Sequence, residues 1–274
     1  MATISMSQEM GSLGKDVAFQ VAEALGLTLI RDELISDIVA VKMQKSKSAI
    51  RRYREGRGSL LDRLETKRKS LGIYSAEEIY EYATKGNALI RGWGATYLLR
   101  PVSHVLRVRV CAPFEIRVQW LMERLDTDDE SFIQEEIRRS DASRHANINQ
   151  WFHETWGNPL DYDLVLNTDR ISIESCVELI KFTVSRPEFQ QTEASQRQLI
   201  NLALESKVRF ALKSNPKTHN IDVSLEADDG KVILEGVVVD DKEREACEST
   251  VAKVTGVRKV DNHLKMIRRT KSFR

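Results

Sequence analysis

Cysteine is scarce in this chain. Its three cysteines, Cys111, Cys176 and Cys247, are odd in number and far apart. That pattern excludes a disulfide framework, and no pair has the short spacing of a zinc-binding motif. We therefore expect three buried or incidental thiols, with no metal bound to them.

The sequence also lacks long apolar runs. None approaches the roughly 20 residues that a helix needs to cross a bilayer, and the N-terminus has no basic stretch followed by an apolar core. This predicts a protein that is not transmembrane and that stays in the cytoplasm. An excess of one charge is missing too, because 42 Lys and Arg face 41 Asp and Glu. Without a basic excess we expect no general affinity for nucleic acid.

What is present is an ordinary globular composition, with 41% hydrophobic and 30% charged residues, in a chain of 274 residues that is long enough for two domains. Up to residue 185, short β-prone segments alternate with helical ones. The predicted strands are 2–6, 28–30, 87–90, 104–110 and 162–168. Strands separated by helices predict an α/β fold, in which a parallel sheet has helices on both faces.

The first stretch of the chain has the order strand, glycine loop, helix. The loop is formed by residues 11–15, and from Val17 apolar residues recur at helical spacing until Gly26, a normal helix stop. This order directs backbone N–H groups and the positive end of a helix at one spot, which suits a phosphate. The same order also occurs in α/β domains without a nucleotide site, so both interpretations stand at this point.

The loop meets the phosphate-loop consensus G-x-x-x-x-G-K-[ST] only in part. Gly14 and Lys15 are present, but Glu9 stands at the first glycine and Asp16 at the hydroxyl position. Asp16 cannot offer magnesium the hydroxyl ligand that Ser or Thr would. In open α/β sheets ligands gather at the carboxyl ends of the strands, so we expect residues 92–94, 111–113 and 167–169 beside this loop.

Helix signals are clear at two further places. Ser75 and Glu78 have the pattern of a capping box that starts a helix ending near Gly86. Residues 128–156 predict one long polar helix.

Residues 42–69 are basic and helical in pattern. Their arginines include Arg51, Arg52, Arg54, Arg57 and Arg63. Guanidinium groups bind phosphate oxygens two at a time, so the segment could receive a second phosphorylated substrate. A charge run is more often a solvated helix face, and that alternative stays open.

A shift in composition near residues 186–192 indicates a linker. The remainder has the order helix, strand, hairpin turn, strand, helix, strand, which predicts a small α+β domain of αββαβ type, with its first helix over 199–213. We place the first domain at 1–186, the linker at 187–195, the second domain at 196–267 and a basic tail at 268–274.

Four ordered segments of the first domain resemble the cytidylate-kinase-like family of P-loop nucleoside monophosphate kinases. Residues 7–16, SQEMGSLGKD, are similar to the family's S-R-E-Y-G-S-G-G-R-E, and residues 88–95, ALIRGWGA, to its second strand and G-R-G-A loop. Residues 110–118, VCAPFEIRV, match its A-P-x-x-x-R-V turn, and 141–144 with 156–168 resemble its lid and exit strand. The resemblance implies a P-loop kinase-type sheet and transfer of phosphate from ATP to a nucleoside monophosphate, CMP or dCMP.

The kinase resemblance also implies roles for individual residues, with ATP and Mg²⁺ as cofactors. Gly11, Ser12, Gly14, Lys15 and Asp16 would hold the ATP phosphates. Lys15, Arg138, Arg139, Asp141 and Arg144 would form the catalytic set, in which the lid arginines close over the transferring group. Arg91, Trp93, Arg117 and Asp141 would contact the acceptor. Asp141 could instead orient an arginine, and an arginine at the start of a helix, such as Arg117, can also serve only a surface.

Several positions depart from the family pattern. Gln8 stands where the family has arginine, and Leu13 replaces a loop glycine, which adds a side chain where backbone must approach phosphate closely. Trp93 occupies the arginine position of the G-R-G loop, which faces the acceptor phosphate in the kinase relatives. Losing one bidentate phosphate contact costs on the order of 2 to 3 kcal/mol. Arg91 or Arg109 could compensate, or Arg109 could belong to a salt-bridged edge.

The second domain resembles a BON domain through residues 230–238, GKVILEGVV, and 254–264, VTGVRKVDNHL, which contain the turn glycines and the phrase G-V-x-x-V-x-N. BON domains are associated with phospholipid binding. The resemblance implies an anionic lipid surface, another protein or a small ligand as its partner, and the basic tail would favour lipid by about 1 kcal/mol per charge close to the surface.

Two hypotheses about function follow. One is an active, divergent nucleoside monophosphate kinase with an accessory BON domain, which the retained Lys15, Asp141 and Arg144 favour. The other is a catalytically degenerate nucleotide sensor or scaffold that regulates the BON domain, which Leu13 and Asp16 favour, as does Trp93.

Overall fold

The computed structural model describes residues 2–55, 68–92 and 94–267. The chain divides into two compact units, Met1–Gln196 and Arg197–Arg274. Each unit has its own sheet and its own hydrophobic core. None of the helices in the described ranges is both long and apolar enough to span a bilayer.

The first unit is built on a five-stranded parallel sheet. Its strands are β1 Thr3–Gln8, β2 Thr28–Ile30, β3 Ala88–Arg91, β4 Val105–Cys111 and β5 Leu164–Asn167, in the order β2-β3-β1-β4-β5. The central strand β1 is buried along its whole length, polar Thr3, Ser5 and Ser7 included, because a parallel sheet is covered on both faces. The predicted α/β fold is confirmed.

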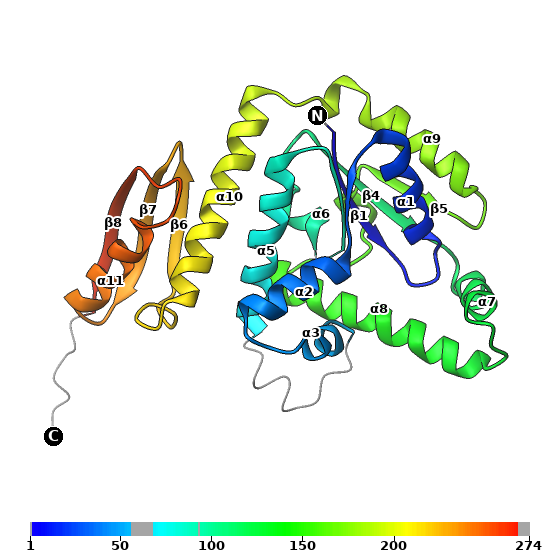
Figure 1. Cartoon of the computed structure of the whole chain (residues 1–274), viewed down its shortest axis with the longest axis horizontal. Helices are drawn as coiled ribbons and strands as arrows, with labels where there is room; N and C mark the ends of the chain where they lie inside the picture. The colour runs from blue at the N-terminus through cyan, green and yellow to red at the C-terminus, as the bar shows by residue number, and fades with distance from the viewer. Residues whose placement is uncertain (1, 56–67, 93, 268–274) are drawn as a thin grey trace. The chain divides into compact units, whose positions relative to one another are not determined.

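Helices cover both faces of this sheet. They are α1 Gly14–Leu25, α2 Asp32–Lys42, α3 Lys47–Arg54, α5 Arg68–Lys85, α6 Ala95–Leu98, α7 Phe114–Leu125, α8 Glu130–Phe152 and α9 Ile173–Val184, with short 3-10 turns η1 Pro159–Asp161 and η2 Pro187–Phe189. Figure 1 shows α1 and α9 together on one side of β1 and β4, and α5 with α6 on the other. On the α1 side, Val17 and Val21 pack against Ile4 and Leu106 of the strands. This packing fixes the start of α1 at the carboxyl end of β1.

The helix start predicted at Ser75 is wrong. Helix α5 begins at Arg68, so Ser75 lies in its interior, where its buried hydroxyl donates to the Leu71 carbonyl at 2.7 Å. Serine can satisfy its hydroxyl in this way inside a helix, and the sequence pattern of a cap does not distinguish the two positions. Glu78, predicted to complete the capping box, pairs instead with Lys42 of α2.

The second unit has the predicted αββαβ order. Its elements are α10 Glu193–Ser214, β6 Val223–Asp228, β7 Lys231–Val238, α11 Asp241–Val251 and β8 Lys259–Met266. Strand β7 is central, antiparallel to β6 across the turn at Asp229 and Gly230 and parallel to β8. Val208, Leu212, Val232, Leu234 and Cys247 are among its core residues.

Helix α10 starts earlier than predicted. It begins at Glu193, inside the segment 187–195 that the sequence indicates as linker, rather than at residue 199. The reason is a reciprocal cap: the Ser195 amide donates to Thr192 Oγ1 at 3.1 Å, and the Thr192 amide donates to Ser195 Oγ at 3.0 Å. The last three residues of the predicted linker, 193–195, are therefore part of helix α10.

Candidate functional site

A cavity of about 490 Å³ opens at the carboxyl edge of the parallel sheet. The glycine loop between β1 and α1, residues 11–15, forms one wall. The end of β3 contributes Arg91 and Gly92, and helix α8 contributes Arg139 and Arg144. Loop, strand end and helix come from distant parts of the sequence, so the fold gathers basic residues and backbone donors around one hollow.

Two glycines of the loop pack closely against the protein around them. A Cβ at Gly11 would lie 2.7 Å from the Arg117 carbonyl oxygen, and one at Gly14 would lie 2.6 Å from Gln8 Oε1. The amides of Asp16 and Val17 both donate to the Leu13 carbonyl at 3.0 Å. The two amides before them, at the start of α1, have no carbonyl partner within the helix. The positive end of α1, with its first amides, thus points to one spot, which is the requirement for binding an anion.

Leu13 takes up a backbone conformation that favours glycine. It is the N-cap of α1 with φ 56° and ψ 9°, in the left-handed region that costs a branched or bulky residue about 1 kcal/mol or more. Its half-buried side chain lines the cavity without closing it.

Lys15 is a free positive charge at this loop. Its side chain is exposed and lines the cavity. Within the described ranges it makes no side-chain hydrogen bond or ion pair. Ser12 lies beside it, but its buried hydroxyl donates to the Glu9 and Val110 carbonyls at 2.9 and 3.2 Å. Its amide donates to the Glu9 carbonyl and its own carbonyl accepts from Thr168, so Ser12 holds the loop in shape.

Asp16 faces away from the cavity. Its carboxylate pairs with Arg124 of α7, with Nη2 2.8 Å from Oδ2, and it does not line the hollow, whereas Arg124 does. The start of α1 and the exposed Lys15 ammonium suit an anionic group such as a phosphate. A Mg²⁺ ion does not fit there, because the residue at the metal-ligand position points outward and is neutralised by an arginine.

Glu9 organises the floor of the site. Its carboxylate accepts from Arg109 Nη2 at 2.6 Å and from the Ala112 amide at 3.2 Å. The Arg109 guanidinium lies over the Trp156 ring, 4.6 Å from its centre, and Trp156 donates to Ser7 Oγ at 3.2 Å. Sequence reasoning missed Glu9 and Trp156 as site residues, although a carboxylate at the first glycine position was the available signal.

The proposed acceptor arginines are held by carboxylates. Arg91 is buried, lines the cavity and pairs with Glu33 at 3.3 Å and Asp32 at 4.0 Å. Arg109, suggested as a substitute for the missing arginine, is bound to Glu9 and does not line the cavity. Trp93 lies outside the described residues. Arg107 belongs to a salt-bridged edge, with Nη2 2.7 Å from Asp163 Oδ1.

Arg117 and Asp141 contact each other. The Arg117 guanidinium donates to both Asp141 oxygens, at 3.2 and 2.9 Å, and neither residue lines the cavity. Asp141 thus orients an arginine, which is one of the two roles that the resemblance implies for it; contact of Arg117 and Asp141 with the acceptor stays a prediction.

Helix α8 separates the three predicted lid arginines. Arg139 and Arg144 line the cavity, and Arg139 pairs with Glu136. Arg138 does not line it; its guanidinium donates to Gln134 at 3.1 Å and lies 4.8 Å from the Phe114 ring centre. The side chains of adjacent residues in a helix point about 100° apart. Arg138 therefore faces away from the cavity although it is next to Arg139 in the sequence.

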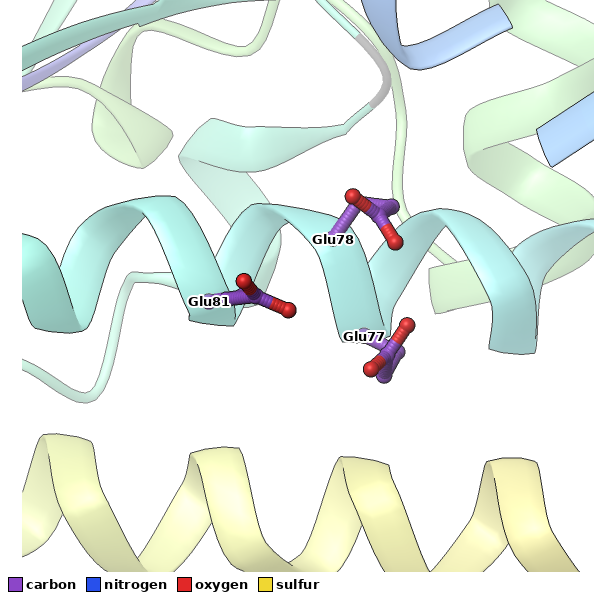
Figure 2. A group of neighbouring side chains, drawn as sticks. All are labelled: Glu77, Glu78 and Glu81. Carbon is purple, nitrogen blue, oxygen red and sulfur yellow. The ribbon is translucent and has the colours of Figure 1, made fainter. Parts of the chain in front are cut away.

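A cluster of carboxylates outside the cavity is formed by Glu77, Glu78 and Glu81 on α5, shown in Figure 2. Its spacing would suit a metal ion, but the Lys42 ammonium pairs with both Glu77 and Glu78. Burial raises the pKa of Glu78, and the Lys42 charge opposes that shift. The cluster is best explained as a partly buried salt bridge between α2 and α5.

The comparisons with known proteins agree with this geometry. Residues 3–170 match the cytidylate kinase-like family, and residues 201–268 match the BON domain. A cytidylate kinase from Staphylothermus marinus is 28% identical over 116 residues, covering 41% of this chain and 62% of that enzyme, so the chain spans less than two thirds of this relative. An uncharacterized protein from Eubacterium ventriosum has a similar structure, with a TM-score of 0.54, 19% identity, and coverage of 68% of this chain and 100% of the other. A shikimate kinase from Bacteroides thetaiotaomicron matches with a TM-score of 0.43 at 13% identity, over 68% of this chain and 99% of its own.

Proposed function

This chain belongs to the cytidylate kinase-like family and ends in a BON domain, and on that premise we propose that its first unit binds ATP and transfers phosphate to a nucleoside monophosphate. The name of the Staphylothermus marinus relative points to CMP or dCMP as the acceptor. The proposal places this reaction in the cytoplasm.

One observation carries the proposal: exposed Lys15, the glycine loop and Arg139 with Arg144 all line the same cavity. Phosphoryl transfer needs little covalent chemistry from the protein and depends on positioning and charge neutralisation. The loop amides and Lys15 would hold the donor phosphates, while the arginines of α8 would meet the transferring group. A bound Mg²⁺ would add charge neutralisation, but no residue of the loop is placed to hold it.

The aromatic residues of the cavity would suit a base. Trp151 and Tyr97 line it together with Ile148 and Asn147, a mixture of flat apolar faces and one amide. Such a wall binds a planar base by stacking and offers one side chain for hydrogen bonding.

A second candidate function is a nucleotide sensor or scaffold without turnover. It is favoured by the pairing of the arginines around the loop with carboxylates of the chain itself: Arg91 with Glu33, Arg109 with Glu9, Arg117 with Asp141, Arg124 with Asp16 and Arg139 with Glu136. A paired guanidinium neutralises less developing charge than a free one. In this alternative, nucleotide binding would change what the BON domain contacts.

For the BON domain we propose a binding role, with an anionic lipid surface or another protein as partner. The exposed apolar side chains at the ends of β7 and β8, Val237, Val239, Met266 and Ile267, agree with a contact surface of either kind.

A coupled assay of ADP release tests the kinase proposal. The purified chain is supplied with ATP and, in separate reactions, with CMP, dCMP, UMP, AMP or GMP. The Lys15→Ala variant is assayed in the same way, with Lys253→Ala as the control, because Lys253 is an exposed lysine of the second unit. Turnover with a pyrimidine acceptor that is lost in Lys15→Ala and kept in the control supports the kinase. ATP binding without turnover for any acceptor would instead favour the sensor.

A further inference from the structure

We propose that Arg124 of α7 takes the place of a metal ion beside the phosphate loop, so that binding of the donor nucleotide needs no divalent cation. This inference rests on the proposed function, because it concerns the donor side of the same cavity. It assigns a binding role to a residue that the sequence pattern did not indicate.

The first step is the position of Asp16. In the phosphate-loop consensus the residue after the lysine carries a hydroxyl that binds magnesium. Here that residue is Asp16, which lies in the first turn of α1, accepts from Arg124 at 2.8 Å and does not line the cavity. The position that would hold the metal is therefore neutralised by a side-chain cation.

The second step concerns the other carboxylates of the cavity. The carboxylates that line it are Glu9, Asp32, Glu33, Glu55 and Glu136. Glu9 is paired with Arg109, Asp32 and Glu33 with Arg91, and Glu136 with Arg139. Mg²⁺ in nucleotide sites is usually held by one or two carboxylates together with the phosphates. Drawing Glu9 or Glu136 to a metal would break its ion pair with an arginine.

The third step is the geometry of Arg124 itself. It lines the cavity, and its side chain is 49% exposed, so a ligand can reach it. Within the described ranges its hydrogen bond to Asp16 uses one of five guanidinium N–H groups, which leaves donors for phosphate oxygens. The carboxylate holds the guanidinium in place, and a pre-oriented arginine loses less side-chain freedom when it binds phosphate.

Together, Asp16 and Arg124 form a unit that replaces the hydroxyl and its metal. The negative Asp16 stabilises the positive start of α1, and Arg124 returns a positive charge to the cavity side. With Lys15 on the same loop, two cations and the loop amides face the phosphates.

Isothermal titration calorimetry with a non-hydrolysable ATP analogue tests the inference, in buffers that contain either magnesium chloride or EDTA. For the wild-type chain we expect the Kd to differ by less than about threefold between the buffers. Arg124→Ala should weaken binding in EDTA by about tenfold or more, the loss expected for a charge-assisted contact. Arg124→Gln keeps the bulk and should weaken binding similarly, while the control Arg186→Ala, an exposed arginine at the end of α9, should change nothing.

Asp16→Ser provides the reciprocal variant. Restoring the hydroxyl should make binding respond to magnesium, with a Kd several-fold lower in magnesium than in EDTA. Binding by the wild type that requires magnesium, or an Arg124→Ala chain that binds as tightly as the wild type in EDTA, would overturn the inference and leave the proposed function intact. No binding in either buffer would overturn both.

Discussion

Arg117 and Asp141 connect the phosphate loop to helix α8. The Arg117 guanidinium donates to both Asp141 oxygens, at 3.2 and 2.9 Å, and also to the Met10 carbonyl at 3.3 Å. Arg117 is buried, so this contact is worth more than a surface ion pair. It fixes α8, and with it Arg139 and Arg144, relative to the loop.

Asp141→Ala should therefore lower both stability and nucleotide affinity. We expect a loss of about 1 to 3 kcal/mol in the free energy of unfolding, because a buried guanidinium loses its main partner. Urea denaturation measures that loss, and calorimetric titration measures the affinity. Asp163→Ala is the matched control: it removes the partner of Arg107 at the sheet edge, and it should reduce stability without changing affinity. Unchanged affinity in Asp141→Ala would contradict the positioning role.

Leu13→Gly should tighten nucleotide binding. The side chain of Leu13 lines the cavity where the backbone would approach phosphate, and its φ of 56° suits glycine. We expect the Kd for an ATP analogue to fall at least about threefold, as the backbone donors come closer to the phosphate. Gln44→Gly, at another positive φ outside the cavity, provides the control and should leave the Kd unchanged. Weaker binding by Leu13→Gly would show that the leucine contributes to the site.

Gly92→Ala should destabilise the chain more than Gly26→Ala does. Both glycines have positive φ, but a Cβ at Gly92 would lie 1.6 Å from Asp32 Oδ1, whereas nothing lies within 4 Å of one at Gly26. The backbone strain is common to both and costs about 1 kcal/mol. Displacing Asp32 should add about 1 to 3 kcal/mol at Gly92, measured by urea denaturation. Equal losses would mean that Asp32 moves aside freely.

His104 should make stability depend on pH. Its ring is buried and forms a 2.7 Å hydrogen bond with Ser195, and burial lowers its pKa below the ordinary value of 6.5. The unfolded chain then binds the proton more readily, so this contribution is complete above pH 6.5 and is lost as the pH falls toward the folded-state pKa. We expect His104→Gln to flatten the decline of unfolding free energy below pH 6.5. His263→Gln, at an exposed position of β8, should keep the wild-type slope.

Much of the fold could be predicted from local patterns. The alternation in 104–110 identified β4, and the glycine loop before Val17 identified the start of α1, because both signals lie within a few residues. Ser75 was misplaced because its hydroxyl bonds to a carbonyl four residues earlier, an interaction that a sequence pattern does not separate from capping.

The candidate site was less predictable, since its decisive contacts join distant residues. Asp16 of α1 pairs with Arg124 of α7, 108 residues later in the chain, and Glu9 meets Arg109 through the register of β1 and β4. The sequence indicated that Arg138 and Arg139 would act together, but the turn of α8 leaves only Arg139 in the cavity. Charge pairing of this kind depends on the tertiary structure.

The most direct test is equilibrium binding of a non-hydrolysable ATP analogue to the wild-type chain and to Lys15→Ala. Lys15 is the free cation of the loop, so its loss should weaken binding by about tenfold or more while the melting temperature stays unchanged. A wild-type chain that binds no adenine nucleotide, or a Lys15→Ala chain that binds as tightly as the wild type, would contradict the account.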